Sequence, residues 1–281
     1  MQKRSVLITG CSSGIGLHIA QTLQQRGYQV FASARKQQDI ERLTQQGLRC
    51  LQLDVSSSKD IQQAVKTVLR ESRGNLFALI NNAGYEQPGA VEDLTREALQ
   101  QQFATNLFGL VELTNTVLLT MHKQEHGRII QISSVLGMVA MPLRGAYIAS
   151  KFALEGITDT LRLELKNTNI HVSLIEPGPI TSRFRQNSLL RHKEFIDSKN
   201  SRFQAQYQAT EKKLNKLGPT VPFTLGPEAV LKSIIHALEN PQPKARYFVT
   251  FPTYLFAVLR RILPTKALDY VLAKSSTVEH K

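Results

Sequence analysis

Tyr147 and Lys151 are the two residues of this sequence whose types and spacing most clearly suggest chemistry. They stand four positions apart in a stretch, Arg144 to Asn167, whose pattern predicts a helix, and side chains at this spacing project from one helix face. A lysine ammonium near a phenol favours the phenolate and lowers the phenol's pKa from about 10. The pair could therefore move a proton at neutral pH. Because the spacing is common by chance, it needs supporting residues.

Two further polar positions could complete such a site. Ser133 and Ser134 follow an apolar run, where a hydroxyl could hydrogen-bond a substrate carbonyl oxygen beside the phenol, and the spacing to Tyr147 favours Ser134. Asn106 lies inside a long helical pattern, in which asparagine is an indifferent helix former. Its amide could serve the site or be satisfied in the interior. The candidate catalytic residues are therefore Asn106, Ser134, Tyr147 and Lys151.

A glycine-rich stretch, Thr9 to Gly16, follows the first apolar run and opens a predicted helix. Its glycines permit a tight turn and close approach to a pyrophosphate, and the helix N-terminus favours the anion. The spacing Gly-x-x-x-Gly-x-Gly differs from the commonest dinucleotide loop, and no Gly-Lys-[Ser/Thr] of a P-loop follows. In this context the stretch predicts a dinucleotide site, with contacts from Gly10, Ser12, Ser13, Gly14, Ile15 and Gly16.

The end of the second predicted strand selects the cofactor. NAD-binding proteins usually place an acid there to bind the ribose 2′-hydroxyl. Here the sequence reads Ser33-Ala34-Arg35-Lys36, and an arginine suits a 2′-phosphate by charge and geometry. Ser12 could add a hydroxyl donor. The sequence therefore predicts NADP(H), unless Arg35 is simply a surface arginine.

Apolar strands alternate with helical patterns through the first 180 residues. This alternation predicts a parallel sheet covered on both faces, and right-handed crossovers make it a Rossmann-type doubly wound α/β fold. Ligands of such folds gather at the carboxyl ends of the strands. The predicted strands are 5–8, 29–34, 48–53, 76–80, 127–133, 170–175 and 246–250. Their ends at Thr9-Gly10, Asn82-Ala83-Gly84, Ser133-Ser134 and Pro177-Gly178 should meet at one crevice.

The chain is interpreted as a single domain over residues 1–250 with a C-terminal apolar and basic extension over 251–281. The alternation stops between 183 and 225, and so long a polar, basic segment with little core of its own predicts either a substrate lid or disorder. Residues 248–263 could cover the substrate pocket, contact another subunit or rest on a bilayer surface beside Arg260 and Arg261.

Composition excludes several classes of protein. The 281 residues are 42% hydrophobic and 20% charged, which excludes intrinsic disorder and collagen-like repeats. The net charge is +13, and residues 183–281 carry 17 basic and 7 acidic side chains. This surplus suggests an anionic membrane face, an acidic ligand or simply a solvated basic surface. No pattern of a nucleic-acid-binding motif is present, so no nucleic-acid partner is expected.

Cysteine usage and targeting signals bear on location and metals. Cys11 and Cys50 cannot build a disulfide framework or a cysteine-rich zinc site, and the histidines show no ligand spacing, so no metal is expected. Low cysteine use fits a reducing compartment. The sequence shows neither a secretory signal pattern nor a run approaching the ~20 apolar residues of a membrane-spanning helix. These features predict a cytoplasmic location.

Taken together, five signatures resemble those of the short-chain dehydrogenase/reductase family over residues 3 to about 250. The family resemblance implies that Tyr147 is the proton donor and acceptor and that Lys151 binds the nicotinamide ribose and lowers the tyrosine pKa. It further implies that Ser134 orients the substrate. The signatures are Thr9-Gly10-x-x-x-Gly14-x-Gly16, Asn81-Asn82-Ala83-Gly84, Asn106, Ser134 with Tyr147-x-x-x-Lys151, and Pro177-Gly178. By the same resemblance, Asn106 would hold a water in a proton relay.

The resemblance also implies the remaining contacts. Asp54 would meet the adenine, and the cofactor would further contact Val55, Asn82, Ala83, Gly84, Tyr147, Lys151, Pro177, Gly178, Ile180 and Ser182, with Thr181 as the alternative to Ser182. The run from Val135 to Leu143 is apolar and would lie beside the reacting carbonyl or belong to the core. The predicted substrate pocket is Ser134, Leu136, Met141 and Tyr147.

A closer similarity is to the hydroxysteroid and retinol dehydrogenase branch, carried by residues 8–16, Arg246-Tyr247 and Leu263-Pro264-Thr265. The prediction is an NADP-dependent reductase of hydrophobic aldehydes or ketones, resembling bacterial aldehyde and ketone reductases. The alternatives are a dehydrogenase working in the oxidative direction and a non-catalytic NADP(H)-binding regulator. The family usually forms dimers or tetramers through helices that here span Leu94–Lys123 and Arg144–Asn167. Peripheral membrane contact through 247–281 is a further expectation, since many retinol-type relatives attach to membranes.

Overall fold

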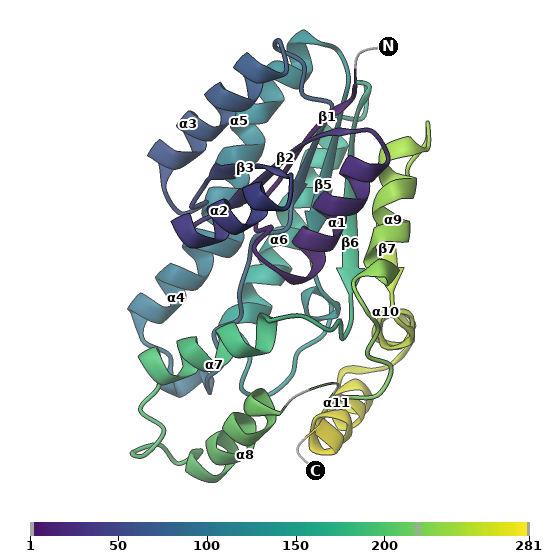
Figure 1. Ribbon diagram of the computed structural model, residues 1–281. Helices are drawn as coiled ribbons and strands as arrows, with labels where there is room; N and C mark the ends of the chain where they lie inside the picture. The colour runs from purple at the N-terminus through teal and green to yellow at the C-terminus, as the bar shows by residue number, and fades with distance from the viewer. Residues whose placement is uncertain (1–2, 217, 219, 280–281) are drawn as a thin grey trace.

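One parallel sheet organises the molecule (Figure 1). The computed structural model describes residues 3–216, 218 and 220–279. Seven strands hydrogen-bond in the order β3-β2-β1-β4-β5-β6-β7, and every neighbouring pair is parallel. They are β1 (Ser5–Ile8), β2 (Gln29–Ala34), β3 (Arg49–Gln52), β4 (Ala78–Asn81), β5 (Gly127–Ile132), β6 (Ile170–Pro177) and β7 (Arg246–Val249). The predicted doubly wound fold is confirmed.

Helices cover both faces of the sheet. On one face the core is built with α1 (Gly14–Gln25) and α9 (Glu228–Glu239), which contact each other, and with Leu43 of α2 (Gln37–Gln45). On the other face lie α3 (Ser58–Glu71), α5 (Gly109–Lys123) and the end of α6 (Gly145–Glu164). The buried strands carry apolar side chains towards both of these layers, as a two-sided parallel sheet requires.

The stretch predicted as one helix from Leu94 to Lys123 is divided. A helix, α4 (Arg96–Phe103), passes through a π-helical turn at Ala104–Phe108 into α5. At the junction Gly109 lies so close to the chain after β3 that an added Cβ would stand 1.6 Å from the carbonyl oxygen of Val55. The π turn places Asn106 in the interior, and such turns occur frequently at functional sites.

The segment 183–225 is folded in its described residues. It forms α7 (Phe184–Phe195) and α8 (Gln204–Asn215). Tyr207 is 1% exposed; its hydroxyl accepts a hydrogen bond from the backbone N–H of Ala90 (2.8 Å) and donates one to Asp93. This small core, which the sequence pattern did not reveal, makes the disorder alternative wrong for the described part. Residues 217 and 219 of the predicted lid lie outside the described residues.

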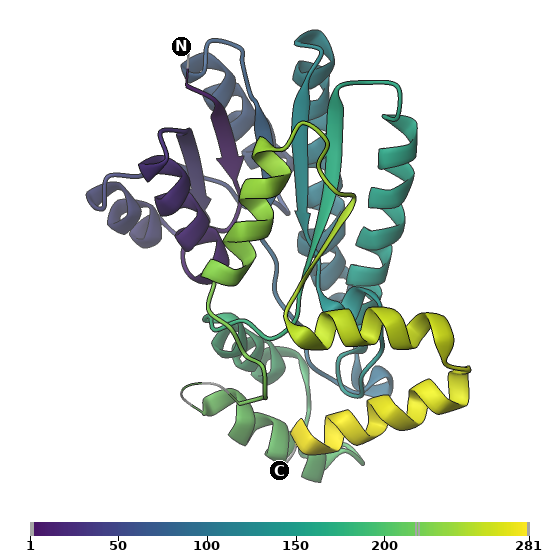
Figure 2. The same ribbon diagram turned by 90° about the vertical axis from the view of Figure 1, so that its right-hand side faces the viewer.

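The C-terminal extension consists of α10 (Phe251–Ile262) and α11 (Thr265–Glu279). In Figure 2 the two helices, in yellow, lie beneath the carboxyl ends of the strands, on the same side of the molecule as α7 and α8. The sheet's ligand-binding edge is thus surrounded by helices from the last hundred residues. Among the described residues, no helix has the length and apolarity needed to cross a membrane.

Candidate active site

The loops after β1 and β4 are joined by hydrogen bonds. The Thr9 hydroxyl accepts from the backbone N–H groups of Asn82 (3.0 Å) and Ala83 (2.9 Å). The Asn82 amide donates to the backbone oxygens of Thr9 (2.9 Å) and Gly10 (3.0 Å). These bonds join residues 72 to 74 positions apart and fix the glycine loop against the Asn-Ala-Gly turn, so two separate signatures form one structure.

The glycines of this loop are required by close packing. Gly10 has φ +70°, and a Cβ there would lie 2.8 Å from the Cα of Ala83. A Cβ on Gly16 would lie 2.4 Å from the amide nitrogen of Asn82. Ser13, extended in front of α1, makes no side-chain cap, so the first N–H groups of the helix suit an anion. The loop therefore fits a dinucleotide pyrophosphate, as predicted from its sequence.

Cations gather beside the glycine loop. Arg35 follows β2 with a side chain 53% exposed, and its guanidinium is 4.0 Å from the Asp54 carboxylate. Arg42, which the sequence reasoning missed, donates to the backbone oxygen of Ser12 (2.7 Å) and to Asp39 (2.9 Å). The only feature of the sequence that pointed to Arg42 was its position about one turn into the helix that follows β2. Arg42 at Ser12 and Arg35 at the end of β2 are therefore the candidates to hold a phosphate.

The predicted catalytic residues meet at the end of β5. Tyr147 and Lys151 lie on one face of α6, 7% and 5% exposed. The side chain of Ser134 hydrogen-bonds to Tyr147. The Lys151 ammonium donates to the backbone oxygen of Ile132 (2.7 Å) and stands 5.8 Å from the centre of the Tyr147 ring. A phenol, a hydroxyl and an ammonium are thus brought together as expected.

The charge state of the pair differs from the sequence expectation. Burial and the negative charge of Glu86 raise the pKa of Tyr147 well above its usual value, although the Ser134 hydrogen bond and Arg144 oppose them. Burial lowers the pKa of Lys151 to about 8, against the opposing effect of Glu155. The predicted lowering of the tyrosine pKa by Lys151 is therefore wrong for this structure, because burial and the charge of Glu86 outweigh the effects that lower it.

Asn106 fixes the chain after the Asn-Ala-Gly turn. Its amide oxygen accepts from the N–H of Tyr85 (3.1 Å), and its nitrogen donates to the Tyr85 oxygen (3.0 Å) and to Ser150 on α6 (3.1 Å). Both N–H bonds of the amide are used, so the side chain connects three elements. A role in holding a water for a proton relay stays a prediction.

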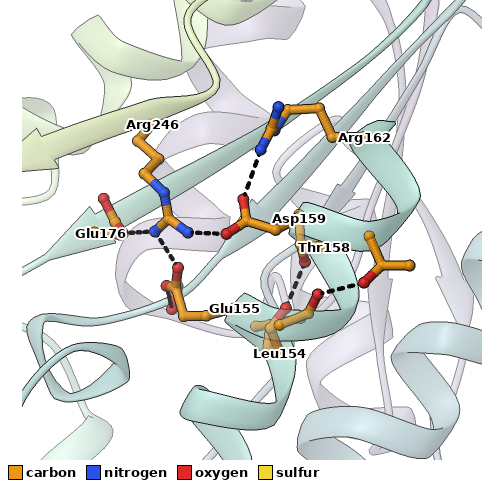
Figure 3. A network of polar contacts seen from close by, with 10 residues as sticks. Leu154, Glu155, Thr158, Asp159, Arg162, Glu176 and Arg246 are labelled. Atoms are coloured by element: carbon orange, nitrogen blue, oxygen red, sulfur yellow. Dashed lines mark hydrogen bonds and ion pairs between the residues drawn. The ribbon is translucent and has the colours of Figure 1, made fainter. Parts of the chain in front are cut away.

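A polar network missed by the sequence reasoning joins α6 to β6 and β7 (Figure 3). The Arg246 guanidinium, from β7, bonds to Glu155 and Asp159 of α6 and to Glu176 at the end of β6. Glu155 also accepts from Ser133. Burial and the neighbouring Glu155 raise the pKa of Glu176 to about 8, although Arg246 opposes them. The feature of the sequence that could have revealed this network is Glu155, which stands four residues after Lys151 on the same helical face.

Apolar side chains from four parts of the chain surround Tyr147. The ring of Phe184, on α7, meets the Tyr147 ring edge-on with centroids 5.6 Å apart. The predicted pocket residues Leu136 and Met141 belong to the same cluster. So do Phe256 of α10 and Leu272 of α11. The extension therefore covers the predicted pocket, which agrees with one of its expected roles, whereas Phe184 was not predicted.

The remaining predicted cofactor residues lie around the same edge. Ser182 faces the glycine loop, because a Cβ on Gly14 would stand 2.8 Å from its Cβ. Ile180 pairs with Leu225, which ties the start of the 183–225 segment to its end. Gly178, after Pro177, packs against Thr250. Val55 is buried in the core, 4% exposed, so only its backbone could reach a ligand. Among the described residues, no group of His, Cys, Asp and Glu side chains suits a metal ion.

A dinucleotide cradle beside a tyrosine, a lysine and a serine at the carboxyl edge of this sheet defines a nicotinamide-dependent oxidoreductase. The chain belongs to the short-chain dehydrogenase/reductase family: the family model described as short chain dehydrogenase matches residues 4–192.

Similar proteins cover nearly the whole chain. An Escherichia coli protein described as the uncharacterized oxidoreductase YbbO is 39% identical over 272 residues, 97% of this chain and 95% of the relative. Human 17-beta-hydroxysteroid dehydrogenase type 1 is 34% identical over 289 residues, 97% of this chain and 85% of the relative, which confirms the similarity to the hydroxysteroid branch. A solved actinorhodin polyketide ketoreductase variant with NADPH has a TM-score of 0.71 at 27% identity, covering 88% and 95% of the two chains.

Proposed function

We propose that this protein reduces hydrophobic aldehydes or ketones to alcohols with NADPH. The observation that carries the proposal is the surroundings of Tyr147, whose hydroxyl meets Ser134 while Leu136, Phe184 and Phe256 belong to the apolar cluster around it. An apolar wall with two converging hydroxyls suits a lipophilic carbonyl compound. Arg42, which binds Ser12, and Arg35 at the end of β2 favour a 2′-phosphate, and the similar solved ketoreductase holds NADPH.

Each residue of the site has its own role in the reduction. NADPH would supply the hydride that reaches the carbonyl carbon. Ser134 holds the carbonyl oxygen by a hydrogen bond, and Tyr147 gives that oxygen its proton. The raised pKa of Tyr147 suits this direction, because it keeps the phenol in the protonated form that a reduction consumes. Lys151 would hold the nicotinamide ribose beside them.

Consumption of NADPH, with NADH in parallel, tests the proposal. The panel holds medium-chain and aromatic aldehydes, retinal and steroid ketones. We expect turnover of a lipophilic carbonyl compound with NADPH and at least about tenfold less with NADH, the loss of one charge-assisted contact. Tight NADPH binding without turnover of any carbonyl would favour the non-catalytic regulator. Faster turnover of the corresponding alcohols with NADP⁺ would favour the oxidative direction.

We further propose that a second copy of the chain packs on α5 and α6. Apolar side chains there are exposed, including Phe108 and Leu119, 59% and 66% exposed, and Ile157. They surround a shallow depression between the two helices. Exposed apolar patches of this kind mark association surfaces. Light scattering coupled to gel filtration should give a dimer or tetramer that Leu119→Glu dissociates, whereas a monomeric wild type would contradict this.

The outer face of α10 supports peripheral contact with an anionic membrane. Tyr254, Val258 and Ile262 are 57%, 55% and 66% exposed, and Arg260 and Arg261 follow in the same helix. Sedimentation with vesicles of anionic phospholipid should bring down the wild type but not Val258→Ser with Ile262→Ser. Equal sedimentation of both would contradict the contact. A cytoplasmic location stays a prediction.

A further inference from the structure

Glu86 is a buried carboxylate beside the active site for which the mechanism has no use. It follows the Asn-Ala-Gly turn after β4 and is 6% exposed. Carboxylates are almost never so buried unless other groups satisfy them, because a desolvated charge is costly. The groups around the Glu86 carboxylate therefore indicate which kind of ligand it can bind.

The backbone on both sides of Glu86 is held rigidly. Tyr85 is bound at its N–H and its oxygen by Asn106, and its oxygen also accepts from Gln102 (2.8 Å). The N–H of Gln87 donates to the side-chain oxygen of Gln102 (2.7 Å). Both amide side chains come from α4 and its π turn. The backbone that carries Glu86 is thus held in place by the fold, as a recognition group requires.

The side-chain contacts of Glu86 leave acceptor capacity. Its Oε1 is 3.4 Å from Nε of Arg144, and within the described chain this oxygen has no hydrogen-bond partner. Its Oε2 accepts from the hydroxyl of Ser188 at 3.4 Å, far longer than a usual O–H···O bond. A carboxylate offers about four lone-pair positions. Two long contacts do not saturate it.

Both partners place the carboxylate next to the catalytic phenol. Arg144 stands immediately before α6, three residues ahead of Tyr147. Ser188 lies one turn after Phe184 on α7 and also donates to its backbone oxygen (2.9 Å), and Phe184 packs on the Tyr147 ring. Glu86 is close enough that its charge raises the pKa of Tyr147. The contacts of Glu86 with Arg144 and Ser188 thus place its carboxylate among the residues that flank Tyr147.

We propose that Glu86 selects substrates that carry an ammonium group on the carbon adjacent to the reacting carbonyl, so that the preferred substrates are lipophilic α-amino ketones. The inference rests on the proposed reduction at Tyr147 and specifies its substrate. The ammonium donates a charge-assisted hydrogen bond to Oε1, which a neutral substituent matches less well. The apolar cluster around Tyr147 takes the alkyl chain. Glu86 then determines specificity, while Tyr147 and Ser134 perform the same chemistry on any bound carbonyl.

A pair of matched substrates tests this assignment. The pair is an α-amino ketone with a long alkyl chain and the plain ketone of the same length. For the wild type we expect kcat/KM with NADPH to favour the amino ketone by about 10- to 100-fold, the size of one hydrogen bond to a charged group. In Glu86→Gln this preference falls to about threefold or less, while kcat/KM for the plain ketone changes little. Glu86→Asp should restore part of the preference.

Controls separate recognition from a structural role. Glu194→Gln alters an exposed α7 carboxylate that pairs with Arg191, and it should keep the wild-type preference. Equal loss for both substrates in Glu86→Gln would make Glu86 a structural ion-pair partner and overturn the proposal. So would a wild type that treats the two ketones alike. If neither ketone nor any aldehyde turns over, the proposed reduction itself fails, which is a different result.

A binding measurement covers the case in which the variant does not fold. A long-chain primary amine and the alcohol of equal length compete with substrate in the wild-type NADPH complex. Their dissociation constants are measured by titration calorimetry. The proposal expects the amine to bind at least about tenfold more tightly, by the same charge-assisted hydrogen bond. Equal affinities would overturn it without any variant.

Discussion

The nucleotide edge of the sheet is fixed by side chains that bind backbone groups, whereas the substrate edge is assembled from contacts between side chains. At the nucleotide edge, the Thr9 hydroxyl binds two N–H groups and the Asn82 amide binds two carbonyls. At the substrate edge, Tyr147 meets Phe184 and an apolar cluster from α10 and α11. A side chain that holds two backbone groups tolerates few substitutions, while apolar side chains packed on one another can be exchanged one at a time. The comparison therefore predicts that cofactor binding and substrate choice can be altered separately.

The largest effect is expected at the substrate edge, from Tyr147→Phe. Loss of the proton donor should lower kcat by about 100- to 10,000-fold, the usual contribution of general acid catalysis. NADPH affinity, measured by fluorescence titration, should change by less than about threefold if the two edges are independent. A variant that retains near-wild-type turnover would remove Tyr147 from the mechanism.

The converse change is Arg35→Ala at the nucleotide edge. Loss of a guanidinium that binds a 2′-phosphate should weaken NADPH binding by about 10- to 100-fold and leave NADH binding almost unchanged. The selectivity between the two ketones should stay as in the wild type. Arg49→Ala removes an equally exposed arginine of β3, paired with Glu71, and serves as the control. Equal weakening of both cofactors in Arg35→Ala would contradict the assignment.

Lys151 connects the two edges, and its titration should be visible in cofactor binding. Its pKa is lowered to about 8, so the side chain is charged below that pH and neutral above it. The affinity for NADPH should therefore fall as pH rises through 8, by up to about tenfold between pH 7 and 9 if the charge supplies one hydrogen bond. Lys151→Met should bind weakly at both pH values. A pH-independent affinity of the wild type would show that its charge does not contribute.

A last prediction concerns stability rather than either ligand. The pKa of Glu176 is raised to about 8 in the folded protein from its ordinary value of 4.5, so between these values the folded chain holds a proton that the unfolded chain has lost. The stability that this proton contributes to the folded chain is fully present below pH 4.5. It is lost as pH rises to 8, by up to about 1.4 kcal/mol per pH unit. Urea unfolding should show that Glu176→Gln loses less stability between pH 6 and 8. Identical slopes would contradict the assignment.

The nucleotide edge could be predicted from the sequence, and the substrate edge only in part. Glycine spacing predicted the loop at Gly10 to Gly16 because only glycine permits such close packing. The Tyr147 and Lys151 spacing likewise fixed a shared helical face. No sequence pattern marked Phe184 or Glu86 as a site residue, because their roles depend on contacts between segments far apart in sequence. The expected shift of the Tyr147 pKa also had the wrong sign, because burial is a property of the assembled fold.

Transfer of deuterium tests the central claim most directly. The wild-type enzyme is incubated with a long-chain ketone and NADPH deuterated at the transferable position, and the product is examined by mass spectrometry. We predict an alcohol that carries one deuterium on the former carbonyl carbon for each NADPH consumed. Bound but unconsumed NADPH, or an alcohol formed without the label, would contradict reduction at Tyr147.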